Sequence, residues 1–326
     1  MKLVLVGPGI MPIPPSGWGA VEILIWDLKC FIEKLYGDDI EVHIVNTPDM
    51  NKIVTDVNTI HPDVVHIHYD VFGCLYDKFN CKNVLLASQY GYLDSGNWFH
   101  GYYSIFNTFV NSTKSGTYIH CVSDKIYTVY KNAGVSDDRL FIMPNGANNE
   151  LFRYTDTPPM RHKSIYLGKI EPRKRQCVYQ DIECMDFVGN HCDANFKTQR
   201  PNYIGPWTKN QLYENLTNYG NLVLLSDGEA HPLVVCEALI SGLGVVVSEA
   251  ASANLDRSLP FITVVPNDKL DNTDYVTAEI CRNREISITQ RRVIREYGLN
   301  AFSYSSIVAR YVAFLKSVVT NCDVFT

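Results

Sequence analysis

The chain alternates short β-branched apolar runs with helical patterns, and it does so in two successive series. The first series predicts strands at residues 2–6, 41–45, 63–67, 83–87, 117–122 and 140–143, with helices at 20–35 and 124–132 among the connections. Ser123 is the expected N-cap of the second of these helices. Such alternation is typical of a parallel sheet with helices on both faces. The first half of the chain is therefore predicted to be a doubly wound α/β domain.

The second series starts after a polar, proline-bearing segment at 154–162, which is interpreted as a linker. It predicts strands at 164–167, 186–188, 221–225, 244–247 and 261–264, helices at 209–216, 232–241 and 287–297, and a last amphipathic helix at 304–318. A chain of 326 residues is also longer than the ~250–300 residues that one core usually reaches. We therefore expect Rossmann-like domains at 1–155 and 156–302, followed by a C-terminal helix at 303–326.

Composition narrows the class of protein and of partner. Hydrophobic residues make up 46% of the chain and charged residues 20%, which suits a globular protein with a core. The net charge of -6 argues against a nucleic-acid partner. No apolar run approaches the ~18–20 residues of a membrane span, and the first run is interpreted as a buried strand rather than a signal peptide. Ten cysteines without a Cys-x-x-Cys pair fit reduced thiols. We expect a cytoplasmic protein, with peripheral membrane contact left open.

The segment from Ser226 to Gly244 contains the most informative polar residues. A predicted strand ends at Ser226, Glu229 lies in the loop that follows, and Glu237 lies on a helix predicted to begin near Pro232. Backbone N–H groups around Pro232, Leu233 and Val234 would suit an anionic ligand, and a carboxylate can accept hydrogen bonds from two vicinal hydroxyls. Glutamates near a helix start also serve simply as solvated or dipole-complementing groups. The residues alone leave both interpretations open.

Two glutamates with seven residues between them, followed by Ala-Leu and a small-residue turn, resemble the signature of the retaining glycosyltransferase family GT4. The resemblance implies that Glu229 contacts the donor sugar and that Glu237 binds the ribose hydroxyls of the nucleotide. The family's usual Glu-Gly-Phe-Gly start is replaced here by Glu229, Ala230, His231 and Pro232. This replacement bears on the shape of the sugar pocket, where His231 is a further candidate.

Three further segments follow the order of the same family. The basic stretch 166–175 resembles its Gly-Arg…Lys-Gly element, with Lys169 at the Arg position, Lys174 at the Lys position and Arg173 beside it. In isolation, four cations in seven residues could equally be a solvated face. The stretch 144–152 resembles the Pro-Asn-Gly-Val-Asp…Phe element. The loop containing Gly17 and Gly19 resembles the glycine-rich loop over the donor phosphates.

The resemblance implies a GT-B fold: two Rossmann-like, doubly wound parallel-sheet domains facing a central cleft, with the last helix crossing back to the first domain. It implies retaining transfer of a sugar from a UDP-, GDP- or ADP-linked donor to a carbohydrate or other hydroxyl acceptor, which the sequence does not identify. Glu229, Lys169 and Lys174 are the expected catalytic group. No Asp-x-Asp pattern and no zinc-ligand spacing occurs, so we expect no cofactor and no metal, with lysines and helix N-termini neutralising the diphosphate.

Several aromatic and polar residues are candidates of a second kind. The family often has a histidine after the fourth strand of its first domain, where this chain has Gln89, Tyr90 and Gly91 instead. These three residues and His68, which follows the preceding strand with His66, are candidates for the sugar side of the site. Trp207 stands where the family touches the base, so it could stack there or pack in the core.

Two other functions are weighed against this one. A non-catalytic nucleotide-sugar-binding subunit of a partner glycosyltransferase would keep the same binding residues without turnover. A nicotinamide dehydrogenase would need a glycine where the first loop has Pro12, and an acidic residue where the second strand ends at Asn46. The sequence thus disfavours the dehydrogenase and leaves the subunit as the alternative.

Overall fold

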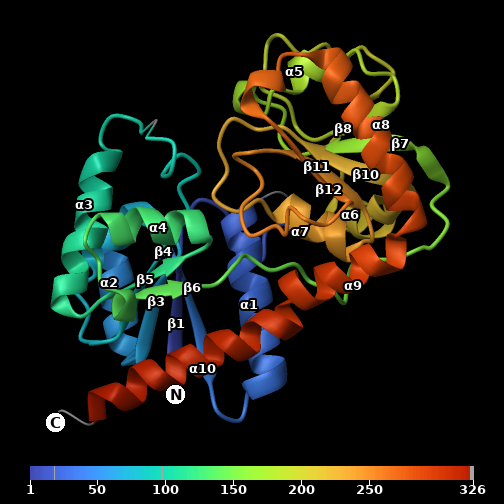
Figure 1. Cartoon of the computed structure of the whole chain (residues 1–326). Coiled ribbons are helices and arrows are strands. Elements are labelled where there is room, and N and C mark those ends of the chain that lie inside the picture. Colours follow the sequence, from blue (N-terminus) through green and yellow to red (C-terminus); the bar gives the residue numbers. More distant parts are fainter. Residues whose placement is uncertain (18, 97, 324–326) are drawn as a thin grey trace. The chain divides into compact units, whose positions relative to one another are not determined.

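The computed structural model describes residues 1–17, 19–96 and 98–323, and the chain divides into two compact units (Figure 1). The first unit comprises Met1–Asn145 together with the C-terminal helix, and the second comprises Gly146–Ser303. Each unit is built on one six-stranded sheet in which all neighbouring strands are parallel. The two α/β domains predicted from the alternation of strands and helices are therefore present.

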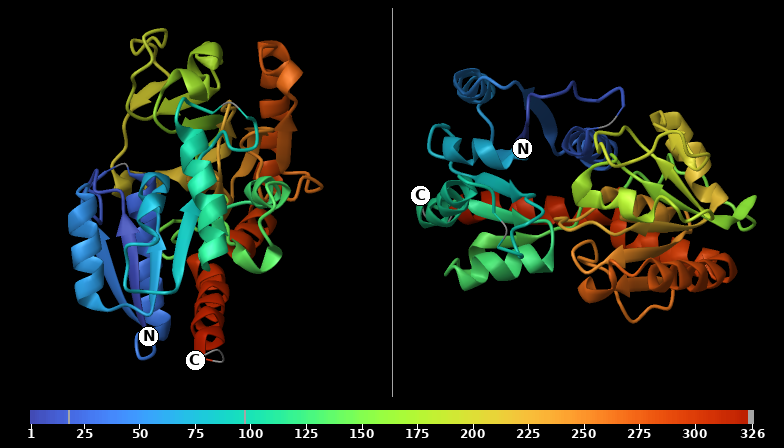
Figure 2. Two further views of the ribbon diagram at one scale, coloured as in Figure 1. Left: turned by 90° about the vertical axis from the view of Figure 1, so that its left-hand side faces the viewer. Right: turned by 90° about the horizontal axis from the view of Figure 1, so that it is seen from above.

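The first sheet has the strand order β2-β1-β3-β4-β5-β6. Its strands are β1 (Lys2–Gly7), β2 (Glu41–Asn46), β3 (Val64–Ile67), β4 (Val84–Ser88), β5 (Tyr118–Cys121) and β6 (Leu140–Ile142). The helices of this unit are α1 (Ala20–Tyr36), α2 (Met50–Ile60), α3 (Tyr102–Ser112), α4 (Asp124–Asn132) and α10 (Tyr304–Asp323), with short 3-10 turns η1 (Asp70–Leu75), η2 (Thr113–Ser115) and η3 (Asp137–Arg139). Helix α10 packs against α1 (Figures 1 and 2). Helices α2 and α3 pack against η1.

The second sheet has the order β12-β11-β10-β7-β8-β9. Its strands are β7 (Met160–Leu167), β8 (Met185–Val188), β9 (Tyr203–Gly205), β10 (Tyr219–Leu224), β11 (Gly244–Ser248) and β12 (Ile262–Val265). The helices are α5 (Gln176–Tyr179), α6 (Lys209–Asn215), α7 (Leu233–Ile240), α8 (Thr273–Thr289) and α9 (Arg291–Phe302), with η4 (Pro172–Lys174), η5 (Leu216–Asn218) and η6 (Asn267–Lys269).

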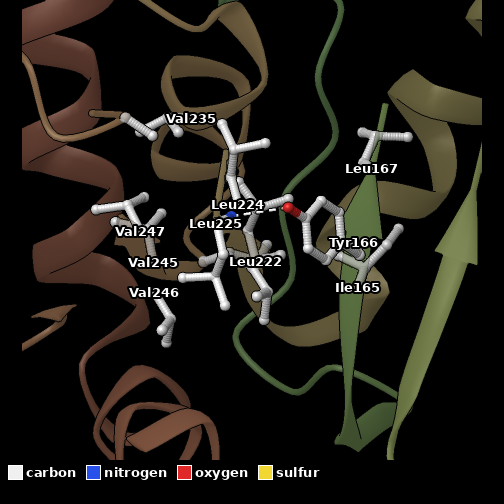
Figure 3. Close-up of a cluster of buried hydrophobic side chains, with 14 of the residues drawn as sticks. Ile165, Tyr166, Leu167, Leu222, Leu224, Leu225, Val235, Val245, Val246 and Val247 are labelled. Atoms are coloured by element: carbon white, nitrogen blue, oxygen red, sulfur yellow. Dashed lines mark hydrogen bonds between the residues drawn. The ribbon is translucent and has the colours of Figure 1, made fainter. Parts of the chain in front are cut away.

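Local sequence signals account for many of these elements. Strand β11 is apolar at Val245, Val246 and Val247, which are all fully buried (Figure 3), because a parallel strand inside a doubly wound sheet is covered on both faces. Ser123 caps α4 as predicted, since its side chain accepts a hydrogen bond from the N–H of Ile126 at 3.3 Å. Asp49 caps α2 in the same way.

The second unit differs from the prediction in several elements, among them most of helix α8, which was not predicted. Strand β9 was not predicted, because three residues are too few to show a strand period. Strand β7 begins at Met160 and so includes the end of the predicted linker. The helix predicted at 287–297 spans the junction of α8 and α9, which is broken at Gln290 with φ -114° and ψ 19°. Buried positions recur at helical spacing on both sides of this break, at Ser287, Arg291 and Ile294.

Arg291 anchors the second unit from inside its core. The side chain is only 2% exposed, and its guanidinium donates to the carbonyl oxygens of Thr155, Thr217, Tyr219 and Ser241. Burial lowers the pKa of Arg291 to about 10. One buried cation therefore ties the segment after the first unit to β10 and to the end of α7.

Candidate functional site

The strand order of the second sheet reverses between β7 and β10. From β7 the chain continues to β8 on one side, whereas β10 is followed by β11 on the other. Doubly wound sheets bind ligands outside the carboxyl ends of the strands at such a reversal. The loops after these two strands contain the predicted basic stretch and Glu229, so parallel pairing brings the two predicted motifs to the same edge.

Tyr166, near the end of β7, forms hydrogen bonds with residues of both loops. Its buried hydroxyl accepts a hydrogen bond from the N–H of Leu225 at 2.8 Å (Figure 3) and donates one to the carbonyl of Lys174. The N–H of Asp227 also donates to the carbonyl of Arg173 at 2.9 Å. These bonds fix the spacing between the basic stretch and the Glu229 loop.

Glu229 is held at one of its two carboxylate oxygens. Its Oε1 accepts from the Ser226 hydroxyl at 2.9 Å and from Arg173 Nη1 at 3.1 Å, and it pairs with Lys174 Nζ at 3.1 Å. Within the part of the chain that the structure describes, no hydrogen bond reaches Oε2. Burial alone would raise the pKa of Glu229, but the charges of Lys174 and Arg173 outweigh it and lower the pKa. The carboxylate is therefore ionised and held in place through one of its two oxygens.

Arg173 organises this cluster. Its Nε and Nη2 donate to Oε1 of Glu171 at 3.1 and 2.8 Å, and its Nη1 reaches the carbonyl of Gly228 as well as Glu229. Such a planar, multiply bonded guanidinium positions its neighbours better than a lysine could. Glu171, Ser226 and the part played by Arg173 were not predicted, because only tertiary pairing joins them to Glu229.

Lys169 is the most loosely held cation of the stretch. Its Nζ lies 3.8 Å from Oε2 of Glu171, and its side chain is 54% exposed, against 13% for Lys174. Arg175 at the other end pairs with Asp227 at 3.2 Å and also with Asp271. Carboxylates thus balance the charges of the predicted basic stretch. An anion that binds Lys169 would have to replace only its 3.8 Å pair with Glu171.

Helix α7 starts at Leu233, with Pro232 as its extended N-cap residue, so the first-turn N–H groups belong to Leu233 and Val234 as expected. Glu237 lies on this helix and is 9% exposed. His231 points into the interior: it is 5% exposed, its ring centroid lies 5.5 Å from that of Phe302, and burial lowers its pKa to about 3.

Trp207 contacts the core of the second unit. Its half-buried ring lies 6.2 Å, between centroids, from that of Tyr219 at the start of β10, whereas the Glu229 loop follows the other end of that strand. This contact agrees with the packing interpretation that the sequence left open for Trp207.

In the first unit, the glycine loop leads from β1 into α1. Gly19 is the N-cap of α1 with φ +134°, a conformation that other residues rarely adopt, and a Cβ at Gly17 would meet nothing within 4 Å. The side chain of Asn46, at the end of β2, stabilises the first part of the loop between β1 and α1. It accepts a hydrogen bond from the N–H of Gly9 and donates one to the carbonyl of Met11, both at 2.8 Å. Its amide is thus used by the fold, which further disfavours the dehydrogenase interpretation.

Of the remaining candidates, Gln89 contacts a carboxylate that the sequence analysis missed. Asp70, at the start of η1, accepts hydrogen bonds from the Tyr102 hydroxyl at 2.6 Å and from the N–H of Gln89 at 3.2 Å. Burial raises the pKa of Asp70 to about 6 although both bonds act against the rise. Tyr90 stacks on Tyr102 with ring centroids 3.8 Å apart, and Gly91 begins the adjoining turn. The sequence signal that could have identified Asp70 is its position three residues after the end of β3.

The described residues contain no group of three or more His, Cys, Asp or Glu side chains arranged to hold a metal ion. In the same residues no helix is both long and apolar enough to cross a bilayer.

Solved structures resemble this chain over nearly its whole length. Sucrose-phosphate synthase from Thermosynechococcus elongatus matches with a TM-score of 0.74 at 15% identity, covering 98% of this chain and 99% of that one. AviGT4, a glycosyltransferase involved in avilamycin A biosynthesis, matches with a TM-score of 0.69 at 15% identity over 98% of each chain. HepE from Anabaena, in complex with UDP-glucose, matches with a TM-score of 0.66 at 13% identity, covering 97% of this chain and 100% of that one.

The fold is that of the GT-B glycosyltransferases. At these identities the likeness establishes the fold, so the predicted fold class is confirmed. No protein-family model matches the chain, and no curated protein matches it. The assignment to family GT4 and the roles of individual residues stay predictions.

Proposed function

We propose that this protein is a retaining glycosyltransferase that moves a sugar from a nucleotide-diphosphate donor to a hydroxyl acceptor. The observation that carries the proposal is the carboxylate of Glu229, bonded at Oε1 to Ser226, Arg173 and Lys174 at the reversal point of the second sheet. The GT-B fold and the UDP-glucose complex of HepE, a structural neighbour, support a nucleotide sugar as the ligand.

In this proposal the carboxylates bind hydroxyl groups of the donor, whereas the lysines and backbone N–H groups bind its diphosphate. Oε2 of Glu229 would accept hydrogen bonds from hydroxyls of the donor sugar, and Glu237 would accept them from the ribose. Lys169, Lys174 and the first-turn N–H groups of α7 would stabilise the diphosphate as it leaves, because charge develops there in the transition state. The bond between the anomeric carbon and the diphosphate oxygen breaks, the acceptor oxygen bonds to that carbon, and the hydroxyl proton passes to the leaving diphosphate.

We further propose that this neutralisation needs no metal ion. Lysine side chains and helix N–H groups supply positive potential where a metal-dependent transferase would place Mg²⁺ or Mn²⁺. The sequence offers the same argument through its lack of an Asp-x-Asp pattern.

Calorimetric titration with UDP-, GDP- and ADP-glucose, without added metal, tests the proposal. We expect one donor to bind, Glu237→Ala to abolish binding, and Glu229→Gln to bind with little or no release of free nucleotide diphosphate. Glu183→Gln, an exposed carboxylate in the same unit, is the matched control.

Two results would contradict the proposal. If none of the three donors binds, the nucleotide-sugar site is absent. If a donor binds but the wild-type protein releases no nucleotide diphosphate with any carbohydrate acceptor, the non-catalytic subunit becomes the better description.

A further inference from the structure

His68 directly follows β3, at the point where the strand order of the first sheet reverses. Its N–H donates to the carbonyl of Val6 on β1 at 3.0 Å, so the residue prolongs the centre of the sheet at its carboxyl edge. From β1 the chain continues to the outer strand β2, whereas β3 is followed by β4 on the other side. A reversal of this kind is where doubly wound sheets bind ligands.

The two histidines next to His68 have complete sets of partners. His120 Nε2 lies 2.8 Å from the carbonyl of Met143, which can only accept, so this nitrogen carries the proton. In the neutral ring, His120 Nδ1 then accepts from His66 Nε2 at 3.2 Å, and His66 Nδ1 accepts from the Tyr311 hydroxyl at 2.7 Å. This hydrogen-bonded chain ties β3, β5 and the residue that follows β6 to α10.

His68 differs from both neighbours. Its ring centroid lies 3.9 Å from that of His66, and the residue is 3% exposed, yet neither of its ring nitrogens finds a hydrogen-bond partner among the residues described. A buried polar group without a partner lowers stability, whereas an apolar side chain of similar size would not. The fold itself therefore makes no use of the two nitrogens of His68.

We propose that His68 binds a hydroxyl group of the sugar substrate, an inference that rests on the function proposed above. A neutral imidazole has one N–H donor and one lone pair, which a hydroxyl matches because it both donates and accepts. A phosphate oxygen only accepts, so it would leave the lone pair of the ring facing a negative charge. Burial lowers the pKa of His68 to about 3, which keeps the ring neutral at physiological pH.

Variants of neighbouring histidines separate this role from a structural one. His68→Leu removes two unsatisfied atoms, so its melting temperature should equal or exceed that of the wild type, while transfer from the bound donor falls at least tenfold. His68→Gln, which restores a donor and an acceptor, should recover part of the activity. His66→Leu, which breaks two hydrogen bonds at a fully buried position, should lower the melting temperature. Binding of the free nucleotide diphosphate should stay within twofold in both His68 variants.

Ring nitrogen resonances give a readout that packing alone would not move. The 15N signals of His68, assigned by their loss in His68→Gln, should shift on addition of UDP-glucose but not of UDP. The inference is overturned if a donor binds and turns over while His68→Leu keeps full transfer, or if His68→Leu is destabilised as much as His66→Leu. If no nucleotide sugar binds, the proposed function has failed; free glucose then serves as the probe, and unmoved His68 signals would overturn this inference as well.

Discussion

Arg173 Nη1 lies 3.1 Å from Glu229 Oε1, across 56 positions of sequence. Two further nitrogens of the same guanidinium donate hydrogen bonds to the carboxylate of Glu171. Arg173 thus holds the carboxylate that we expect to orient the donor sugar, while its own donors are engaged by protein groups. This arrangement makes it a positioning residue in the proposed site.

Replacing Arg173 should therefore affect the sugar more than the nucleotide. In Arg173→Gln the carboxylate of Glu229 keeps Lys174 and Ser226 but loses one charge partner, so its pKa should rise and its orientation should loosen. We expect turnover to fall at least tenfold, with a smaller change in the affinity for UDP measured by calorimetry. Arg292→Gln, which breaks an exposed pair with Asp156, is the control. An equal loss for UDP and UDP-sugar would instead indicate that Arg173 contacts the phosphates.

Removal of divalent metal should leave the activity intact. The proposed diphosphate site relies on Lys169, Lys174 and the start of α7, none of which is a metal ligand at neutral pH. We expect the rate of nucleotide release to be the same with and without excess EDTA. A rate that collapses in EDTA and returns with Mg²⁺ or Mn²⁺ would refute metal independence.

Arg291 should be among the most sensitive positions for stability. Arg291→Met would deprive several buried carbonyls of their donor, and each unsatisfied buried group costs about 1–3 kcal/mol. We expect a loss of roughly 3 kcal/mol or more in the free energy of unfolding of the second unit, measured by urea denaturation. Its neighbour Arg292, with an exposed side chain, offers a matched control, since Arg292→Met should change the stability by only about 0.5 kcal/mol. Equal effects at both positions would show that the buried bonds contribute little.

Acid should destabilise the protein through its buried histidines. Burial lowers the pKa of His68 and of His231 to about 3 and that of His120 to about 4, against 6.5 for an exposed ring. Below about pH 6.5 these histidines are protonated in the unfolded chain but stay neutral in the folded chain. The free energy of unfolding is therefore highest above about pH 6.5 and falls as the pH drops toward 4. In this pH range each such histidine lowers the free energy of unfolding by about 1.4 kcal/mol for every pH unit of acidification.

Asp70 acts in the opposite direction over part of the same range. Its raised pKa of about 6 means that the folded state takes up a proton first, which adds stability as the pH falls below that value. Urea denaturation at pH 7.5, 6 and 5 should show the histidines prevailing, because they outnumber this carboxyl group. A free energy of unfolding that is constant from pH 7.5 to 5 would contradict the prediction.

The order of the strands other than β9 was readable from the sequence because it depends on local periodicity, whereas helices α2 and α3 and most of α8 were not predicted. β-branched runs such as Val245–Val247 and caps such as Ser123 specify their own conformation, and two series of them imply two parallel sheets. Short elements such as β9, and the break at Gln290, escaped prediction because they leave too little periodic signal.

The sequence by itself thus determined the two-domain α/β architecture and the identity of the charged motifs. Only the tertiary structure decided which of these groups meet. The pairing of β7 with β10 brings Arg173 to Glu229, the pairing of β1 with β3 places His68 at a strand reversal, and packing buries Arg291 and His231. The physical reason is that hydrogen-bonded neighbours in a parallel sheet are distant along the chain, so no local pattern records which side chains will share an edge.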